Sequence, residues 1–181
     1  ENGNIIPDRT PKQRKNNTKF TFARYMFAFI RKRFGDLPVW KIAAAQRGMT
    51  DDNLIQSTNY KYLDEKGKIL DMEGFQVSLG PLALPLNLRA TRNGTLVSIT
   101  WDDPRDEPSA APTDRMMVGI FYADYRDTFT LEKETGATRR DGKCEIILRD
   151  DDGEVCIHPF FARADNTAFS EDKAITLPDT E

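Results

Sequence analysis

Residues 87–101 contain the feature that most constrains the fold. Two runs of alternating character, Asn-Leu-Arg-Ala-Thr-Arg and Thr-Leu-Val-Ser-Ile-Thr-Trp, flank the pair Asn93-Gly94. Asn and Gly tolerate the positive φ angles that a two-residue type I′ turn requires, so the segment predicts a tight β-hairpin. The alternation through Val97, Ile99 and Trp101 places the Trp101 indole in the predicted core.

Short apolar runs separated by Gly, Asp and Asn turns continue after the hairpin. With the hairpin they predict seven strands, near residues 86–91, 95–101, 116–123, 127–133, 143–149, 155–163 and 172–177. Seven short strands at this spacing are typical of an antiparallel β-sandwich. A further strand is expected at 74–79. The proline- and acid-rich segment 102–114 is expected to be a mobile loop, because it has little apolar surface to bury.

Residues before about 64 have the period of α-helices instead. Thr10-Pro11-Lys12-Gln13 is a capping box with proline at the first helical position, and apolar residues then recur at helical spacing until Gly35. A second helix is expected to begin at 36–38 and to end at residue 46 or 47, and a third is expected after Thr50. We therefore predict an α+β protein: a basic helical region at 1–68, a strand and proline-rich connector at 69–85, and a β-sandwich at 86–181.

The net charge of −3 conceals two halves of opposite sign. Residues 1–50 carry 11 Lys/Arg against 3 acids, and residues 51–181 carry 15 Lys/Arg against 26 acids. The basic half is interpreted as a solvated helix face that complements an acidic neighbour, such as the next copy of the chain; the alternative is nucleic-acid contact through residues 9–33. The candidate basic patch consists of Arg14, Lys15, Arg24, Arg31, Lys32 and Arg33. No apolar run approaches the roughly 18 residues of a membrane span, so none is expected.

Residues that could carry chemistry are few. Cys144 and Cys156 lack the spacing of a metal site, so buried free thiols are expected, with a disulfide as the alternative. His158, the only histidine, is interpreted as a strand residue rather than a catalytic base. The run 150–153 lacks the ligand spacing of a calcium loop. No catalytic, cofactor-binding or metal residue is assigned, and the chain is predicted not to be an enzyme.

The predicted strand 155–163 is apolar on both faces, with Cys156, Phe160 and Ala162 on one and Val155, Ile157, Pro159 and Phe161 on the other. A sandwich strand with one solvated face alternates with polar residues, so something must cover the second face. The apolar stripe of the predicted helices is the chain's own candidate, and a partner subunit is the alternative. The candidate interface residues are Phe27, Ile30, Phe34, Trp40, Ile157 and Phe161.

Two segments resemble known families. Residues 10–20 resemble the T-P-x-Q-x-x-x-R-x-K-F helix start of an uncharacterised Bacteroidota family, apart from the arginine, which this segment lacks at that position. Members of that family typically have helices followed by a C-terminal immunoglobulin-like domain. Residues 97–101, and residues 160–166 with Ser170, are similar to the second and sixth strands of fibronectin type III modules. The resemblance implies an immunoglobulin- or fibronectin III-like sandwich and no particular mechanism; the helix start is also similar to segments of phage-derived genes.

These observations favour a non-enzymatic structural or assembly protein with a protein partner or a homo-oligomeric state. A component of a virion or an extracellular assembly is the sharpest form of this hypothesis, and such a location is favoured over the cytoplasm. One alternative is a nucleic-acid-associated protein that uses the basic helix. Another is a carbohydrate- or surface-binding module that uses Tyr122, Tyr125 and Phe129.

Overall fold

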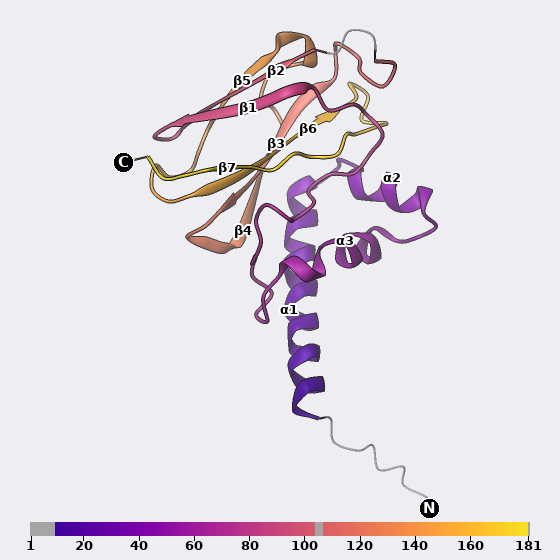
Figure 1. Cartoon of the computed structure of the whole chain (residues 1–181). Helices are drawn as coiled ribbons and strands as arrows, with labels where there is room; N and C mark the ends of the chain where they lie inside the picture. The colour runs from indigo at the N-terminus through magenta and orange to yellow at the C-terminus, as the bar shows by residue number, and fades with distance from the viewer. Residues whose placement is uncertain (1–9, 104–106, 181) are drawn as a thin grey trace, which may run out of the picture.

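The computed structural model describes residues 10–103 and 107–180 and has three layers (Figure 1). Two antiparallel β-sheets face each other, and helices from the N-terminal region cover the outer face of one sheet. The protein is therefore α+β, with a helical N-terminal region followed by an antiparallel β-sandwich, as the sequence predicts.

The helices begin and end where the local sequence indicates. The α1 helix (Pro11–Phe34) starts with the predicted capping box, in which Thr10 and Gln13 each accept a hydrogen bond from the other's backbone N–H. It ends at Gly35, whose φ of 57° favours glycine. The α2 helix (Val39–Gln46) follows Pro38, and α3 (Asp51–Asn59) is capped by Thr50, continuing as a short 3₁₀ turn, η1 (Tyr60–Tyr62).

The seven predicted strands are present. One sheet has the order β1 (Leu86–Asn93), β2 (Leu96–Asp102), β5 (Lys143–Ile147), and the other has β4 (Tyr125–Glu132), β3 (Arg115–Tyr122), β6 (Val155–Ala162), β7 (Ile175–Leu177). A second 3₁₀ turn, η2 (Arg139–Asp141), precedes β5. The β1–β2 hairpin pairs Asn93 with Leu96, so its two turn residues are Gly94 and Thr95. Gly94 has a φ of 62°, whereas Asn93 lies in β1 and has no positive φ. The predicted hairpin is present, but its type I′ turn at Asn93-Gly94 is wrong, because the turn lies one residue later.

Strands β3 and β6 divide their side chains between two apolar cores. Between the sheets lie Met116, Val118, Ile120, Val155, Ile157 and Phe161, with Trp101 from β2. Under the helices lie Met117, Phe121, Cys156, Phe160 and Ala162. Because strand side chains alternate, a strand that is apolar at every position is buried on both faces. Trp101 is buried as predicted, and its indole N–H donates to the Arg139 carbonyl oxygen at 2.8 Å.

The two cysteines lie in different cores. Cys144 is buried between the sheets and Cys156 under the helices, and both are free thiols. The prediction of buried free thiols is confirmed.

The strand expected at 74–79 is absent, and that prediction is wrong. Side chains replace a neighbouring strand as hydrogen-bond partners of this backbone. Asn59 donates to the Gln76 carbonyl and accepts from the Gln76 N–H, and Oδ1 of Asp172 accepts from the N–H groups of Val77 and Ser78 at 3.1 Å each. Residues 74–79 therefore form an irregular connector between the helices and the sandwich, and side-chain hydrogen bonds hold it in place.

The acidic segment 102–114 is also more ordered than its composition indicates. Residues 104–106 lie outside the described residues, but Asp114 is fully buried and pairs with Arg139 at 2.9 Å. The Ser109 carbonyl accepts from the Ala83 N–H at 3.2 Å. The expectation of a mobile loop is wrong for residues 107–114, because Asp114 has a buried cation as its partner.

Candidate functional site

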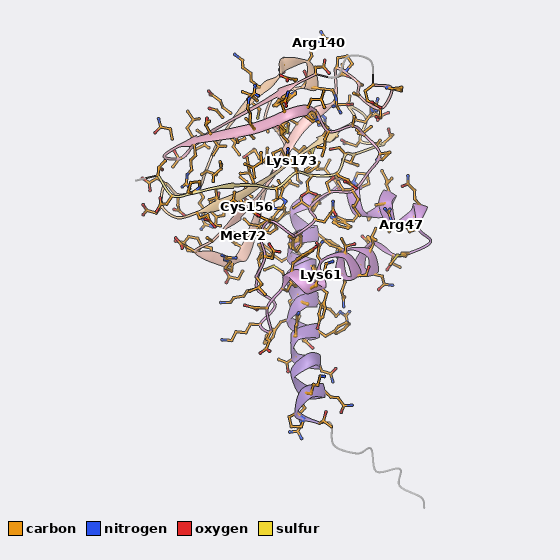
Figure 2. All side chains as sticks on the ribbon, in the orientation of Figure 1. Arg47, Lys61, Met72, Arg140, Cys156 and Lys173 are labelled. Carbon is orange, nitrogen blue, oxygen red and sulfur yellow. The ribbon has the colours of Figure 1, made fainter. Side chains whose placement is uncertain are left out.

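The densest group of chemically active side chains is a buried cluster around His158. Cys156 and His158 are two residues apart on β6, so their side chains share the helix-covered face. Nδ1 of His158 lies 2.6 Å from Oδ2 of Asp172, and Nε2 lies 2.7 Å from the Met72 carbonyl oxygen and 3.4 Å from Sγ of Cys156. Met72 and Cys156 are both labelled at this junction of helices and sheet in Figure 2.

The geometry determines the charge of the ring. A carbonyl oxygen and an ionised carboxylate can only accept hydrogen bonds, so both ring nitrogens of His158 donate and the ring is an imidazolium. Burial alone lowers the pKa of His158. The hydrogen bonds to Asp172 and Cys156, with the negative charge of Asp172, outweigh burial and raise the pKa to about 9.

Through His158, this cluster joins Asp172 and the Met72 backbone to β6, and it lacks the features of a catalytic base. The order Cys, His, Asp is that of a nucleophile with its base, but a general base needs an unprotonated nitrogen and a path for substrate. Cys156 and His158 are fully buried, and the Nε2 proton is bonded to Met72. The sequence prediction placed His158 in a strand correctly and Cys156 as a buried thiol, but it missed that the two side chains meet, although a spacing of two residues in a strand indicates a shared face.

The exposed candidate site is the first half of α1, which projects beyond the rest of the molecule (Figure 1). From Thr10 to Phe22, every residue whose side chain is described is exposed, except Lys19, which is half-buried; Ala23 is the first buried residue. Phe20, Phe22 and Tyr25 keep 44%, 43% and 70% of their surfaces exposed. We call residues 11–25 the α1 arm.

A groove of about 720 Å³ lies between the α1 arm and α3. Its α1 side contains Phe20, Arg24 and Tyr25, and its α3 side contains Asn53 and Gln56. Aromatic rings, a guanidinium and amide groups together can hold a segment that carries both apolar and acidic side chains.

Part of the predicted basic patch is engaged within the chain. Arg31 lines the groove and forms an ion pair with Asp52 of α3. The Arg33 guanidinium lies over the Phe29 ring, 4.7 Å from its centroid. Arg24 lines the groove, where its charge is available to a bound segment.

The remaining patch residues are spread along the helix. Arg14 and Lys32 are exposed and separated by 18 positions, or about 27 Å of helix. The side chain of Lys15 lies outside the described residues. Successive helical residues turn by about 100°, so Arg33 projects from a different side than Arg14. The five patch residues whose side chains are described therefore do not all share one face of α1.

The predicted apolar interface is a core rather than an exposed surface. Its helical members are buried against the β-sheet: Phe27, Ile30, Phe34 and Trp40. They share this core with Cys156 and Phe160, not with Ile157 and Phe161, which point between the sheets. The prediction is therefore wrong for Ile157 and Phe161. Phe161 packs edge-to-face on Trp101, with ring centroids 5.7 Å apart, which fixes its face as the inner one.

The aromatic residues proposed for carbohydrate binding do not form a platform. Tyr122 and Phe129 are buried, and only Tyr125 of the three is exposed. The Tyr122 hydroxyl is bonded internally, accepting from the Arg149 N–H at 3.1 Å. That hypothesis is wrong for this set of residues, because two of the rings are used as core.

Within residues 10–103 and 107–180, no helix is both long enough and apolar enough to cross a membrane. In the same residues, no group of three or more His, Cys, Asp and Glu side chains is placed to hold a metal ion.

Comparisons with known proteins concern the sandwich. No model of a known protein family and no curated protein matches the chain. Three solved structures each cover 56% of it. A structure described as a myokine is 16% identical, is matched over 100% of its own length and has a TM-score of 0.41. The FN1–FN3 domains of chicken CNTN1 are 7% identical, are matched over 32% of their length and have a TM-score of 0.41. A fibronectin III domain of human contactin 1 is 10% identical, is matched over 82% of its length and has a TM-score of 0.36. Each of these likenesses is one of fold alone, with a TM-score below 0.5, and the two-sheet sandwich follows from the chain's own strand order.

Proposed function

We propose that this protein is a non-enzymatic interaction or assembly protein, in which the sandwich is a rigid base that carries the α1 arm to a protein partner. The observation that carries this proposal is the arm itself: projecting helical turns with exposed aromatic rings (Figure 1). Interfaces are enriched in aromatic residues and arginine, and Phe20, Arg24 and Tyr25 supply that composition beside the groove.

Within the chain, the arm is held by its continuity with the buried half of α1 and by contacts near its C-terminal end, where Lys19 and Phe20 lie against the Tyr60 ring. Isolated helices shorter than about 12–15 residues are marginal in water. The capping box at Thr10 and the side-chain bonds from Thr18 and Thr21 to carbonyls four residues earlier lie within the helix itself. Phe20 and Phe22 are already more than half buried, so a partner that covered either ring would gain less than half of the roughly 1.5–3 kcal/mol that burial of a fully exposed ring provides. A protein partner that covered these rings would therefore stabilise the helical conformation of the arm.

Charge indicates what kind of protein surface fits. The α1 helix contains eight Lys/Arg and no acidic residue. An acidic surface with apolar side chains in it would complement the arm in both respects. The narrower hypothesis of a virion or extracellular-assembly component depends only on the resemblance of residues 10–20. The nucleic-acid alternative is less favoured, because Arg31 forms an ion pair with Asp52 and the Arg33 guanidinium lies over the Phe29 ring.

Site-specific photo-crosslinking tests the proposal. A benzoylphenylalanine residue is placed at Tyr25 or Phe22, with a matched control at Ile147, which is 67% exposed on β5. In an extract of the cells that naturally make the chain, we expect discrete protein adducts from the arm positions and none from the control. No adducts, or the same adducts from all three positions, would contradict the proposal. Adducts that nuclease removes would support the nucleic-acid alternative instead.

A further inference from the structure

An acidic rim lies beside β4, formed partly by the segment that follows the helices. The Ile69 N–H donates to the Arg126 carbonyl oxygen at 2.7 Å, and the Arg126 guanidinium donates to the Leu70 carbonyl at 3.0 Å. These bonds hold residues 69–71 along the edge of β4. Leu70 and Tyr125 remain 63% and 51% exposed there. We call the following exposed residues the acidic rim: Leu70, Asp71, Asp124, Tyr125 and Asp127.

The α1 arm and the acidic rim are complementary in two independent respects. The arm combines exposed aromatic rings with cations, and the rim combines an exposed leucine and tyrosine with carboxylates. Apolar patches that are left exposed in this way are typical of interfaces, and opposite charge gives such an interface its register. We propose that the α1 arm docks on the acidic rim of a second copy of this chain. This inference rests on the proposed function and names its partner.

The N-terminal part of α1 projects away from the sandwich of its own molecule (Figure 1). The buried apolar positions of α1 begin at Ala23 and continue to Phe34, and the arm extends beyond them (Figure 1). The turn before the rim touches the arm, because a Cβ at Gly67 would lie 2.7 Å from the Phe22 backbone. The arm and the rim are therefore near neighbours on one molecule. Two copies can exchange both contacts about a twofold axis, the commonest symmetry of homodimers.

The distribution of charge also fits association between copies. Residues 1–50 are strongly basic and residues 51–181 strongly acidic, yet the net charge is only −3. Two copies therefore repel each other weakly as whole molecules, while the arm of each attracts the rim of the other.

A charge-reversal experiment tests the pairing. Sedimentation equilibrium of the full chain measures the dimer dissociation constant at low and high salt. We expect wild-type dimers that weaken as salt rises. Arg24→Glu and Asp127→Lys, each alone, should raise the dissociation constant by more than about tenfold, because each homodimer then contains two like-charge contacts. An equimolar mixture of the two variants should form a heterodimer, since both of its contacts again join opposite charges.

Matched control variants separate the effect of a charge change at the arm or the rim from the effect of a change in net charge. Arg140→Glu and Glu145→Lys change the net charge equally at exposed positions away from the arm and the rim, and both should dimerise like wild type (Figure 2 labels Arg140). Tyr25→Ala should weaken dimers without changing charge. Circular dichroism confirms that each variant is folded.

Three results would overturn the inference. A wild-type chain that stays monomeric at every concentration excludes the second copy as partner; crosslinking from the arm to a different protein would then still support the proposed function. A dimer that Arg24→Glu and Tyr25→Ala leave unchanged uses another surface. Two monomeric variants that also remain monomeric when mixed would show that the arm does not meet the rim.

Discussion

The charged ring of His158 makes the stability of this protein depend on pH in a predictable direction. In the folded state its pKa is raised to about 9, whereas an unperturbed histidine has a value of 6.5. Between these two values the folded chain keeps a proton that the unfolded chain has lost. Folding stability is therefore fully supported by this group below about pH 6.5, and it falls as the pH rises through about 9.

The size of the effect follows from the difference in pKa. One pH unit is worth about 1.4 kcal/mol for a single proton, so the free energy of unfolding should fall by roughly 3 kcal/mol across the window. His158 is fully buried, and Asp172 nearly so, so solvent screens the pair weakly. For a domain of this size such a loss is a large part of the total stability.

Urea denaturation at a series of pH values measures this dependence, and NMR observes the ring directly because the chain has one histidine. Asp172→Asn is the matched variant. Its side-chain oxygen can still accept from Val77 and Ser78, while its amide can donate to a neutral ring nitrogen. We expect this variant to be nearly flat over the window. A flat wild-type curve, an equal slope in the variant, or a ring that titrates near its ordinary pKa would refute the reasoning.

Four further substitutions probe the fold by urea denaturation. Trp101→Ala should cost about 3–5 kcal/mol, because the indole fills the core between the sheets; a loss below about 1 kcal/mol would contradict that placement. Asp114→Ala should cost about 3–5 kcal/mol by leaving the buried Arg139 guanidinium without its carboxylate, whereas a neutral result would mean that the ion pair is dispensable. Gly80→Ala should be far more damaging than Gly94→Ala: a Cβ at Gly80 would overlap a backbone carbonyl oxygen, whereas at Gly94 it meets nothing within 4 Å and only the positive φ is strained, by about 1–2 kcal/mol. Equal losses would refute the packing at Gly80.

The parts of the fold that local chemistry determines were predictable. The capping box at Thr10, the glycine stop at Gly35 and the presence of a hairpin turn at Gly94 each depend on residues adjacent in sequence. The need to cover both faces of β6 was also visible, because a strand with one solvated face cannot be apolar throughout. Which face the helices cover was not visible, since alternation separates the two faces without saying which one meets the second sheet.

The parts that depend on distant partners were not predictable. Asp114 belongs to an acidic, proline-rich segment, and nothing near it in sequence indicates the arginine 25 positions away that pairs with it. Residues 74–79 have the pattern of a strand, but Asp172 takes the place of a neighbouring strand from 94 or 95 positions away. The α1 arm is a similar case: its apolar stripe was evident, but the point at which burial begins, Ala23, depends on core residues that are distant in sequence.

The division of α1 into two halves connects the fold to the proposed function. The sheet that contains β3 and β6 carries Phe121, Phe129 and Phe160 on its outer face, and the buried half of α1 covers them. The other sheet exposes polar residues such as Arg89 and Glu145 and needs no cover. One core therefore extends across residues 69–85, where the sequence predicted a connector between two domains. Removing the helices would expose an apolar face of the sheet. We therefore expect the helical region and the sandwich to unfold together. Of α1, only the C-terminal half takes part in covering that face. The N-terminal half makes no comparable contribution to the core, and so its exposed rings and its charge are best explained by a partner.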